Sequence, residues 1–213
     1  MGSFVVYVVK PPTILYDQAM TKRVVIVHGW GGFPEEGWFP WLKLELEAKG
    51  FEVQVPQLPE ADTPRIFNWV PKLAEVVGTP DEQTYFVGHS LGCQTIARYL
   101  EALPDGVMIG GAVFVAGFFK HLKGLEDNAD VQETDRHWLM TPLDLARVKS
   151  HVPKSVAIFS DNDPWVPLDN QDDFRDKLGS EIIIEHAKGH FSGPGDHCTE
   201  LPIVLEKVLE IAK

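Results

Sequence analysis

The stretch from Thr84 to Cys93 constrains the fold of this chain more than any other. Residues that favour β-strands run into the pattern Gly88-x-Ser90-x-Gly92, and apolar residues at helical spacing follow it. The order is therefore strand, sharp turn and helix, with a serine at the apex. Such a turn strains the serine backbone and lifts its hydroxyl clear of the sheet. We expect glycine at both flanks because a Cβ atom there would clash with a neighbouring strand or helix.

Strand-like and helical segments alternate along the rest of the chain. Predicted strands cover residues 23–27, 51–55, 84–87, 112–116, 155–159 and 181–185. Predicted helices cover residues 38–49, 64–77, 91–103, 143–149, 169–178 and 201–212. Gly50 and Gly179 are expected to end two of these helices. Most of the strands are apolar on both faces, which is typical of buried parallel strands. The pattern predicts an α/β fold with a mostly parallel sheet of about six strands and helices on both faces.

The composition is that of a globular domain. The chain has 213 residues, of which 44% are hydrophobic and 23% are charged, so a single domain can bury a two-faced sheet. A formal net charge of −12 disfavours binding to nucleic acid or to an anionic membrane. Two cysteines are too few for a disulfide framework, so we expect free thiols and a cytoplasmic protein. Cys93 is expected to lie against the sheet and Cys198 in a polar loop.

Residues 1–19 stand apart from this pattern. The apolar run at residues 4–9 is too short to span a membrane, and the features of a signal peptide are missing. Met20 comes directly before the first predicted strand. We therefore expect one domain over residues 20–213. The first 19 residues would be an N-terminal extension, either translated from an upstream start or forming an edge strand.

The residues around Ser90 resemble the nucleophile elbow of the α/β-hydrolases. In that superfamily an acid and then a histidine follow the serine along the chain. Both occur here, in the loop at residues 160–167 and at His190. Residues 24–32 are similar to the first strand and the oxyanion loop of the same fold. The resemblance implies a three-layer α/β-hydrolase fold and serine hydrolase activity.

One branch of the superfamily is more similar than the others. The short length of the chain, the HGWGG loop at residues 28–32 and the segment at residues 59–65 resemble the small serine hydrolases of the retinoblastoma-binding protein 9 type. The resemblance covers residues 22–213. In α/β-hydrolases a cap domain is inserted where this chain has a polar connection, residues 118–150. A segment this short cannot form a cap with its own core, so we expect only a short helix, a minimal cap and an open site.

A serine hydroxyl is a weak nucleophile at neutral pH and needs an adjacent base. We predict that His190 is this base, because it follows the last predicted strand. Carboxyl ends of parallel strands form the ligand-binding edge, where Ser90 also lies. Structural roles are expected for His28 and His89. The other histidines are expected at the end of a strand, beyond the catalytic loop or on the surface of the insertion: His186, His197, His121, His137 and His151.

An acid is needed to hold the imidazole in the correct tautomer. Three aspartates lie on one loop and at the start of the helix after it. Asp163 occupies the position of the acid in the similar hydrolases, before a Pro-x-Val-Pro turn, and is favoured. The alternative is Asp161, which otherwise serves as a turn residue. Asp169 is expected to cap the following helix.

By the same resemblance, the backbone amides of Trp30 and Leu91 form the oxyanion hole. Phe33, Trp165 and Phe191 are the main candidates to line an apolar pocket. Further aromatic residues expected near the same rim are Trp30, Trp38, Phe118, Phe119 and Trp138. The patterns of phosphate-binding and dinucleotide-binding loops are absent, as is metal-ligand spacing, so we expect no metal and no cofactor.

The sequence thus predicts a carboxylesterase-like serine hydrolase that uses Ser90, Asp163 and His190 and forms an acyl-enzyme. The expected substrates are small, uncharged, apolar esters. The alternative is a catalytically silent protein-interaction module on the same fold. A pocket-protein motif, L-x-C-x-E, is incomplete because Asp196 replaces its leucine. Dehalogenases and epoxide hydrolases would need an aspartate at position 90. We expect a small-molecule partner, and neither nucleic acid nor a membrane.

Overall fold

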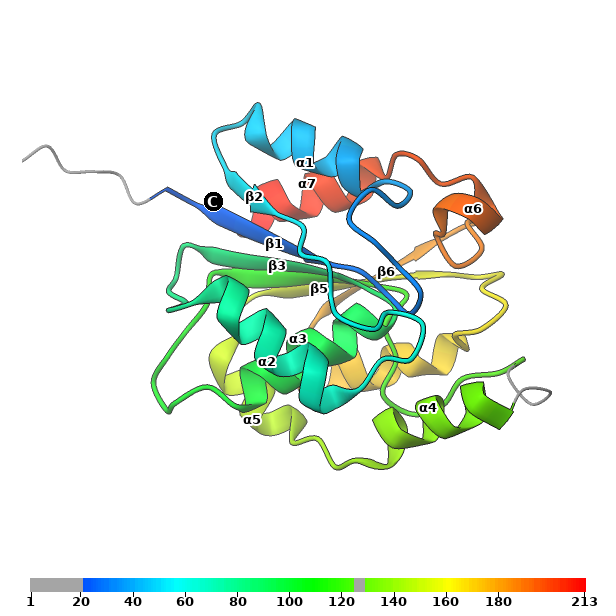
Figure 1. The fold of residues 1–213 in the computed structure, drawn as a ribbon. Helices are drawn as coiled ribbons and strands as arrows, with labels where there is room; N and C mark the ends of the chain where they lie inside the picture. The colour runs from blue at the N-terminus through cyan, green and yellow to red at the C-terminus, as the bar shows by residue number, and fades with distance from the viewer. Residues whose placement is uncertain (1–20, 125–128) are drawn as a thin grey trace, which may run out of the picture.

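The computed structural model describes residues 21–124 and 129–213, so the predicted extension at 1–19 lies outside the described residues. Its centre is a six-stranded sheet in the order β2-β1-β3-β4-β5-β6 (Figure 1). The strands are β1 (Arg23–Val27), β2 (Glu52–Gln54), β3 (Thr84–His89), β4 (Gly111–Val115), β5 (Ser155–Ser160) and β6 (Glu181–Glu185). Every pair of neighbours in this sheet is parallel. The predicted parallel sheet is therefore confirmed.

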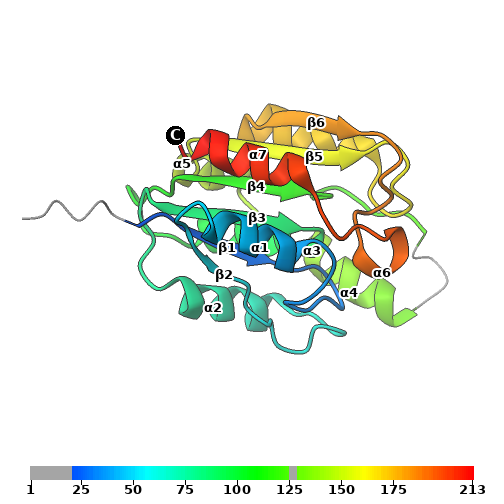
Figure 2. The same ribbon diagram turned by 90° about the horizontal axis from the view of Figure 1, so that it is seen from above.

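Helices cover both faces of the sheet and make three layers (Figures 1 and 2). One face carries α1 (Phe39–Glu47) and α7 (Pro202–Ile211), which share a hydrophobic core with the sheet. The other face carries α2 (Ile66–Val77), α3 (Leu91–Glu101) and α5 (Leu145–His151), which share a second core. This is the predicted three-layer α/β-hydrolase fold. No helix of the described ranges is long and apolar enough to cross a bilayer.

The central strand and the central helix are buried on all sides. Every residue of β3 is buried, as is every residue of α3 except its last, Glu101. Cys93, in the first turn of α3, is fully buried as predicted, and its Sγ lies 3.5 Å from the Val115 carbonyl oxygen. Burial raises the pKa of this thiol, which keeps it protonated. The predicted helix-ending glycines, Gly50 and Gly179, both have positive φ angles.

The insertion contains more helix than the sequence pattern indicates. Its described part includes α4 (Ala129–Met140) as well as α5, although only the second was predicted. The polar residues of α4 hide its periodicity, and a single buried indole anchors it. Trp138 donates from Nε1 to the Pro64 carbonyl at 3.1 Å and packs edge-on against Trp69. Arg98 of α3 donates to the carbonyl of Trp138 at 2.6 Å and to those of Thr141 and Pro142.

The predicted helix at residues 169–178 is also different. A 3₁₀ turn (Leu168–Asn170) is followed by a π-helical segment (Asp173–Leu178). Asp169 lies inside the 3₁₀ turn and does not cap a helix, so that prediction is wrong. Buried Asn170 fixes the turn instead, because its Oδ1 accepts from the amides of Phe119 and Lys120 at 3.1 Å. A further short helix, α6 (Gly193–Asp196), follows the loop after β6.

Candidate active site

Ser90 lies at the turn between β3 and α3 and has strained backbone angles, φ 52° and ψ −120°. Its amide donates to the Val115 carbonyl at 2.8 Å, which fixes the turn to β4. A Cβ atom at Gly92 would lie 2.2 Å from the Val27 carbonyl oxygen, and one at Gly88 would lie 3.0 Å from the backbone of α3. Both glycines are therefore needed, as predicted. The six strands point in the same direction, so their carboxyl ends lie along one edge of the sheet (Figure 2). Ser90 lies at this edge because it directly follows β3.

His190 is paired with Asp163. Nδ1 of the imidazole lies 2.8 Å from Oδ2 of the carboxylate, and both side chains are buried. The other oxygen, Oδ1, accepts from the amides of Trp165 and Val166 at 2.8 and 2.9 Å. A carboxylate only accepts hydrogen bonds, so the ring proton sits on Nδ1 and Nε2 is left as an acceptor. This is the tautomer that a general base needs.

Asp161 makes a different set of contacts. Its carboxylate lies 2.5 Å from Nδ1 of His186 and accepts from the amide of Ala187 at 2.9 Å. The amide of Ala187, and next the hydrogen bond from His186, lower the pKa of this carboxyl. Asp161 thus ties the loop after β5 to the loop after β6 at an exposed position. The structure brings Asp163, and not Asp161, to His190.

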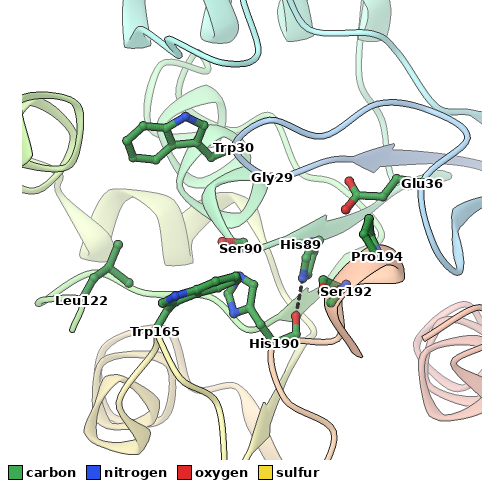
Figure 3. Close-up of a pocket in the computed structure, with 11 residues that line it drawn as sticks. Gly29, Trp30, Glu36, His89, Ser90, Leu122, Trp165, His190, Ser192 and Pro194 are labelled. Atoms are coloured by element: carbon green, nitrogen blue, oxygen red, sulfur yellow. Dashed lines mark hydrogen bonds between the residues drawn. The ribbon is translucent and has the colours of Figure 1, made fainter. Parts of the chain in front are cut away.

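Ser90 and His190 line the same cavity, which has a volume of about 400 Å³ (Figure 3). Trp165 borders one part of the cavity, and its ring packs edge-on against the imidazole of His190 with 4.9 Å between the ring centroids. The residues that line the cavity are Gly29, Trp30, Glu36, His89, Ser90, Leu122, Trp165, His190, Ser192, Pro194 and Gly195. The candidate nucleophile and base therefore open onto one space at the loop edge of the sheet.

Two backbone amides beside Ser90 can serve an oxyanion. The amide of Leu91 is the first of α3 and has no acceptor within the helix. The loop after β1 comes close to the serine, since a Cβ atom at Gly29 would lie 3.0 Å from the Ser90 Cβ. No described residue accepts from the amide of Trp30 in this loop, whose indole is held by a hydrogen bond to the Asp62 carbonyl at 2.9 Å.

Some of the predicted pocket residues line the cavity and others do not. Trp165 lines the cavity, as does Trp30. Phe191 does not, because it is completely buried in the core with α1 and α7, and its carbonyl accepts from the Trp38 indole at 3.1 Å. Phe33 is 44% exposed and lies outside the cavity lining. Those two assignments are wrong, because Phe191 packs into the core and Phe33 faces the solvent. Trp38, Phe118 and Trp138 are also buried in the core.

Sequence reasoning missed several lining residues. Ser192, Pro194 and Gly195 follow His190 directly, and this proximity along the chain could have identified them. Glu36 and Leu122 come from loops that carry no periodic pattern, so no local signal identifies them. Their positions depend on how the loops pack.

The two histidines next to the site are structural, as predicted. Nδ1 of His28 lies 2.8 Å from the Gly29 carbonyl oxygen, and Nε2 accepts from the Leu58 amide at 3.0 Å. Burial lowers its pKa. His89 donates from Nε2 to the His190 carbonyl at 2.7 Å, seen as the dashed line in Figure 3. Burial, and next the charge of His190, lower the pKa of His89 to about 3. Both rings are therefore neutral at neutral pH.

The surface prediction for the histidines of the insertion is wrong for His151. This ring is buried, and its Nδ1 lies 2.7 Å from the Val107 carbonyl oxygen. The cause is the packing of α5 against α3, which turns the last residue of α5 inward. His121 is exposed and lies 3.6 Å from the Asp169 carboxylate, whereas His137 is half-buried. His197 is exposed and has a left-handed backbone conformation.

Comparison with known proteins identifies the family. The family model described as serine hydrolase matches residues 24–208. The chain belongs to the serine hydrolase family. This serine hydrolase is 32% identical to YdeN of Bacillus subtilis (strain 168) over 187 residues, covering 88% of this chain and 94% of YdeN. It is 26% identical to the serine hydrolase RBBP9 of Rattus norvegicus over 191 residues, covering 89% and 96%.

A solved structure shows the same fold. The crystal structure of the B. subtilis ydeN gene product has a TM-score of 0.80 and 31% sequence identity, covering 90% of this chain and 98% of that one. The predicted resemblance to the α/β-hydrolases and to the retinoblastoma-binding protein 9 branch is thus confirmed. Family membership also favours an enzyme over the silent interaction module.

Proposed function

We propose that this serine hydrolase cleaves small carboxylic esters through Ser90, His190 and Asp163, by way of an acyl-enzyme. One observation carries the proposal: the hydrogen-bonded pair of Asp163 and His190 opens onto the cavity that also contains Ser90. The strained turn at Ser90 supports it, because strain of this kind persists where the surroundings fix a residue for function.

In the first half of the reaction, Oγ of Ser90 attacks the carbonyl carbon while its proton passes to Nε2 of His190. The amides of Leu91 and Trp30 donate to the oxyanion of the tetrahedral intermediate. The intermediate collapses when the carbon–oxygen bond to the leaving group breaks and His190 returns the proton to the departing alcohol. Water then attacks the acyl-enzyme by the same steps, which releases the acid and restores Ser90.

The walls of the cavity support the proposed substrate class. Trp30, Leu122 and Trp165 offer apolar surface to an acyl or alcohol chain, and a volume of about 400 Å³ fits a small ester. Among the described residues, no lysine or arginine lines the cavity, so these residues offer no counter-charge to an anionic substrate. Esters with short apolar chains are therefore the proposed substrates.

The test is Ser90→Ala, assayed with a fluorophosphonate probe and with p-nitrophenyl butyrate. Labelling should disappear and kcat should fall by several orders of magnitude, because members of a triad act as a unit. The matched control is Ser150→Ala, which removes an exposed hydroxyl on α5 and should leave labelling unchanged. Retention of more than about a tenth of the wild-type kcat in folded Ser90→Ala would overturn the proposal.

A further inference from the structure

Among the described residues that line the cavity with Ser90, one carries a carboxylate. Glu36, from the loop between β1 and α1, lines the cavity and is half-buried. In Figure 3 its carboxylate lies on one side of Ser90, beside Pro194. Trp30 and Leu122 lie on the opposite side of the serine. The cavity thus has an apolar side and a side that carries a negative charge.

The fold makes room for this carboxylate. A Cβ atom at Gly32 would lie 2.8 Å from Oε2 of Glu36, so only glycine at that position leaves the carboxylate in place. On the other side, the ideal Cβ position of Gly193 is 3.8 Å from Cγ of Glu36. The side chain is therefore packed between the loop after β1 and the loop that follows His190, and does not extend freely into solvent.

No described side chain neutralises Glu36. Its carboxylate accepts a hydrogen bond from the amide of Phe33, and no described lysine, arginine or histidine forms a salt bridge with it. Burial raises the pKa of its carboxyl, while the amide of Phe33 and then the charge of His190 act in the opposite direction. Of the other ionisable groups in the cavity, His89 is neutral and His190 is the proposed base. A half-buried carboxylate without a cationic partner is stabilised when a cation binds beside it.

We infer that Glu36 binds a cationic group of the substrate, so that the preferred esters carry an ammonium group. This inference rests on the proposed function and names the substrate class of the same site. It adds a charged anchor to the apolar contacts, and short uncharged esters remain substrates of lower kcat/KM.

The position of Glu36 assigns the cation to the alcohol part of the ester. In the proposed reaction, His190 gives its proton to the departing alcohol, so the alcohol lies on the side of His190 and of the loop after it. Glu36 lies beside Gly193 of that same loop, since a Cβ atom added there would be 3.8 Å from its Cγ. The acyl chain then lies toward Trp30 and Leu122. Esters of amino alcohols fit this arrangement.

The experiment compares butyrylcholine with 3,3-dimethylbutyl butyrate, its uncharged analogue of the same shape. In the wild-type enzyme, kcat/KM should be about tenfold higher for the cationic ester, the scale of one partly screened ion pair. Glu36→Gln should remove this preference. Glu35→Gln, which removes the same charge from the adjacent exposed residue outside the cavity lining, should keep it.

Two further measurements test whether the preference is electrostatic and which part of the ester carries the cation. Raising the salt concentration should lower the wild-type preference without any substitution, because salt screens a half-exposed pair. A second pair of substrates, ethyl 4-aminobutyrate and ethyl pentanoate, moves the cation to the acyl part and should show little preference. The comparison of wild type with Glu36→Gln thus also reports on which part of the ester faces Glu36.

The inference is overturned if the wild-type enzyme hydrolyses both butyrates equally, or if the preference survives in Glu36→Gln, as it would if the tryptophan rings alone bound the cation. Equal loss of kcat/KM for both butyrates in Glu36→Gln would also overturn it, since Glu36 would then act on His190 and not on the substrate. A Glu36-dependent preference confined to the 4-aminobutyrate ester would overturn the assignment to the alcohol part. Failure of the proposed function itself looks different: neither butyrate is hydrolysed, and the fluorophosphonate probe does not label Ser90.

Discussion

At the scale of single residues, Asp163 has two tasks and gives one oxygen to each. Oδ1 accepts from the amides of Trp165 and Val166 and so fixes the shape of its own loop. Oδ2 faces Nδ1 of His190 and fixes the ring. The shape of the loop and the orientation of the His190 ring therefore depend on the same side chain, and a substitution can separate the two effects.

Asp163→Asn should make this separation. The amide oxygen can still accept from the loop, so the protein should fold, but the NH₂ group would face Nδ1 and place the ring proton on Nε2. A base in the wrong tautomer cannot accept from Ser90, and kcat should fall by up to ~10⁴-fold. The assay is p-nitrophenyl butyrate turnover. Asp161→Asn is the matched control, and its effect should be far smaller. The reverse order of the two effects would move the acid to Asp161.

A second prediction at this scale concerns His89 and pH. Its pKa is about 3 in the folded protein, against 6.5 for a histidine exposed to water. When the pH falls below 6.5, the ring is therefore protonated in the unfolded chain but stays neutral in the folded protein. The stability associated with neutral His89 is complete above pH 6.5 and is lost as the pH falls from there toward 3. The slope contributed by one such group is at most about 1.4 kcal/mol per pH unit.

The measurement is the free energy of unfolding in urea at about pH 7.5 and about pH 5.5, on either side of the ordinary histidine pKa. His89→Gln keeps a donor for the His190 carbonyl without a titrating ring, and its stability should depend less on pH than that of the wild type. His197→Gln removes an exposed ring and should keep the wild-type pH dependence. If His89→Gln and the wild type lost the same free energy between the two pH values, His89 would not be the group responsible.

At the scale of elements, the position of the candidate nucleophile depends on how closely α3 approaches β1. The contact is made at Gly92, where a Cβ atom would lie 2.2 Å from the Val27 carbonyl oxygen and 2.7 Å from that of His28. A larger side chain must push the helix away from the sheet. Because Ser90 immediately precedes α3, the serine must move with it.

Gly92→Ala should therefore reduce both stability and activity. Overpacking of this kind costs about 1–3 kcal/mol, measured by urea unfolding, and kcat of the folded fraction should also fall. Gly50→Ala is the control, because nothing lies within 4 Å of its ideal Cβ position although its φ is +86°. It should cost about 1–2 kcal/mol through backbone strain alone and leave kcat unchanged. A Gly92→Ala protein with full activity would show that the serine does not depend on this contact.

The elements also show how far the sequence predicts this molecule. The bounds of β1 and β6 match the predicted strands, because short apolar runs between turn signals leave little choice. The chain order of Ser90, Asp163 and His190 placed each residue in a loop that follows a predicted strand. Loops after parallel strands lie at the same edge of the sheet, so the three residues were expected to lie close together. The rest was not predictable in the same way. The periodicity of α4 is hidden by polar residues, and whether Phe191 or Glu36 faces the cavity depends on contacts between distant loops.

At the scale of the whole molecule, the site lies at an open edge with a short, anchored insertion beside it. Arg98 fixes the C-terminal end of α4 through hydrogen bonds to the carbonyls of Trp138 and Thr141. The helix is thus attached to the layer of α2 and α3. The cavity beside it has a volume of about 400 Å³, which is the size expected for the short ester chains of the proposed substrates.

A series of p-nitrophenyl esters from acetate to palmitate should therefore give its highest kcat/KM at short acyl chains. The rate should rise smoothly with the concentration of each ester, with no jump where micelles form, because access does not require a lid to open at an interface. Butyrate serves as the internal reference. A maximum at the longest chains, or a sharp onset at the micelle boundary, would contradict the open site.

The course of α7 has a practical consequence. A loop joins α6 to α7, and α7 then runs back across the sheet toward the side where the strands begin (Figure 2). There the side chain of Lys22 donates to the carbonyl of Ala212, the residue before Lys213. A bead, an electrode or a fused carrier joined to Lys213 would sit behind the enzyme and leave the mouth of the cavity facing the solution. Lys213 is therefore a suitable point of attachment for an immobilised enzyme, and no change to the rest of the sequence is needed.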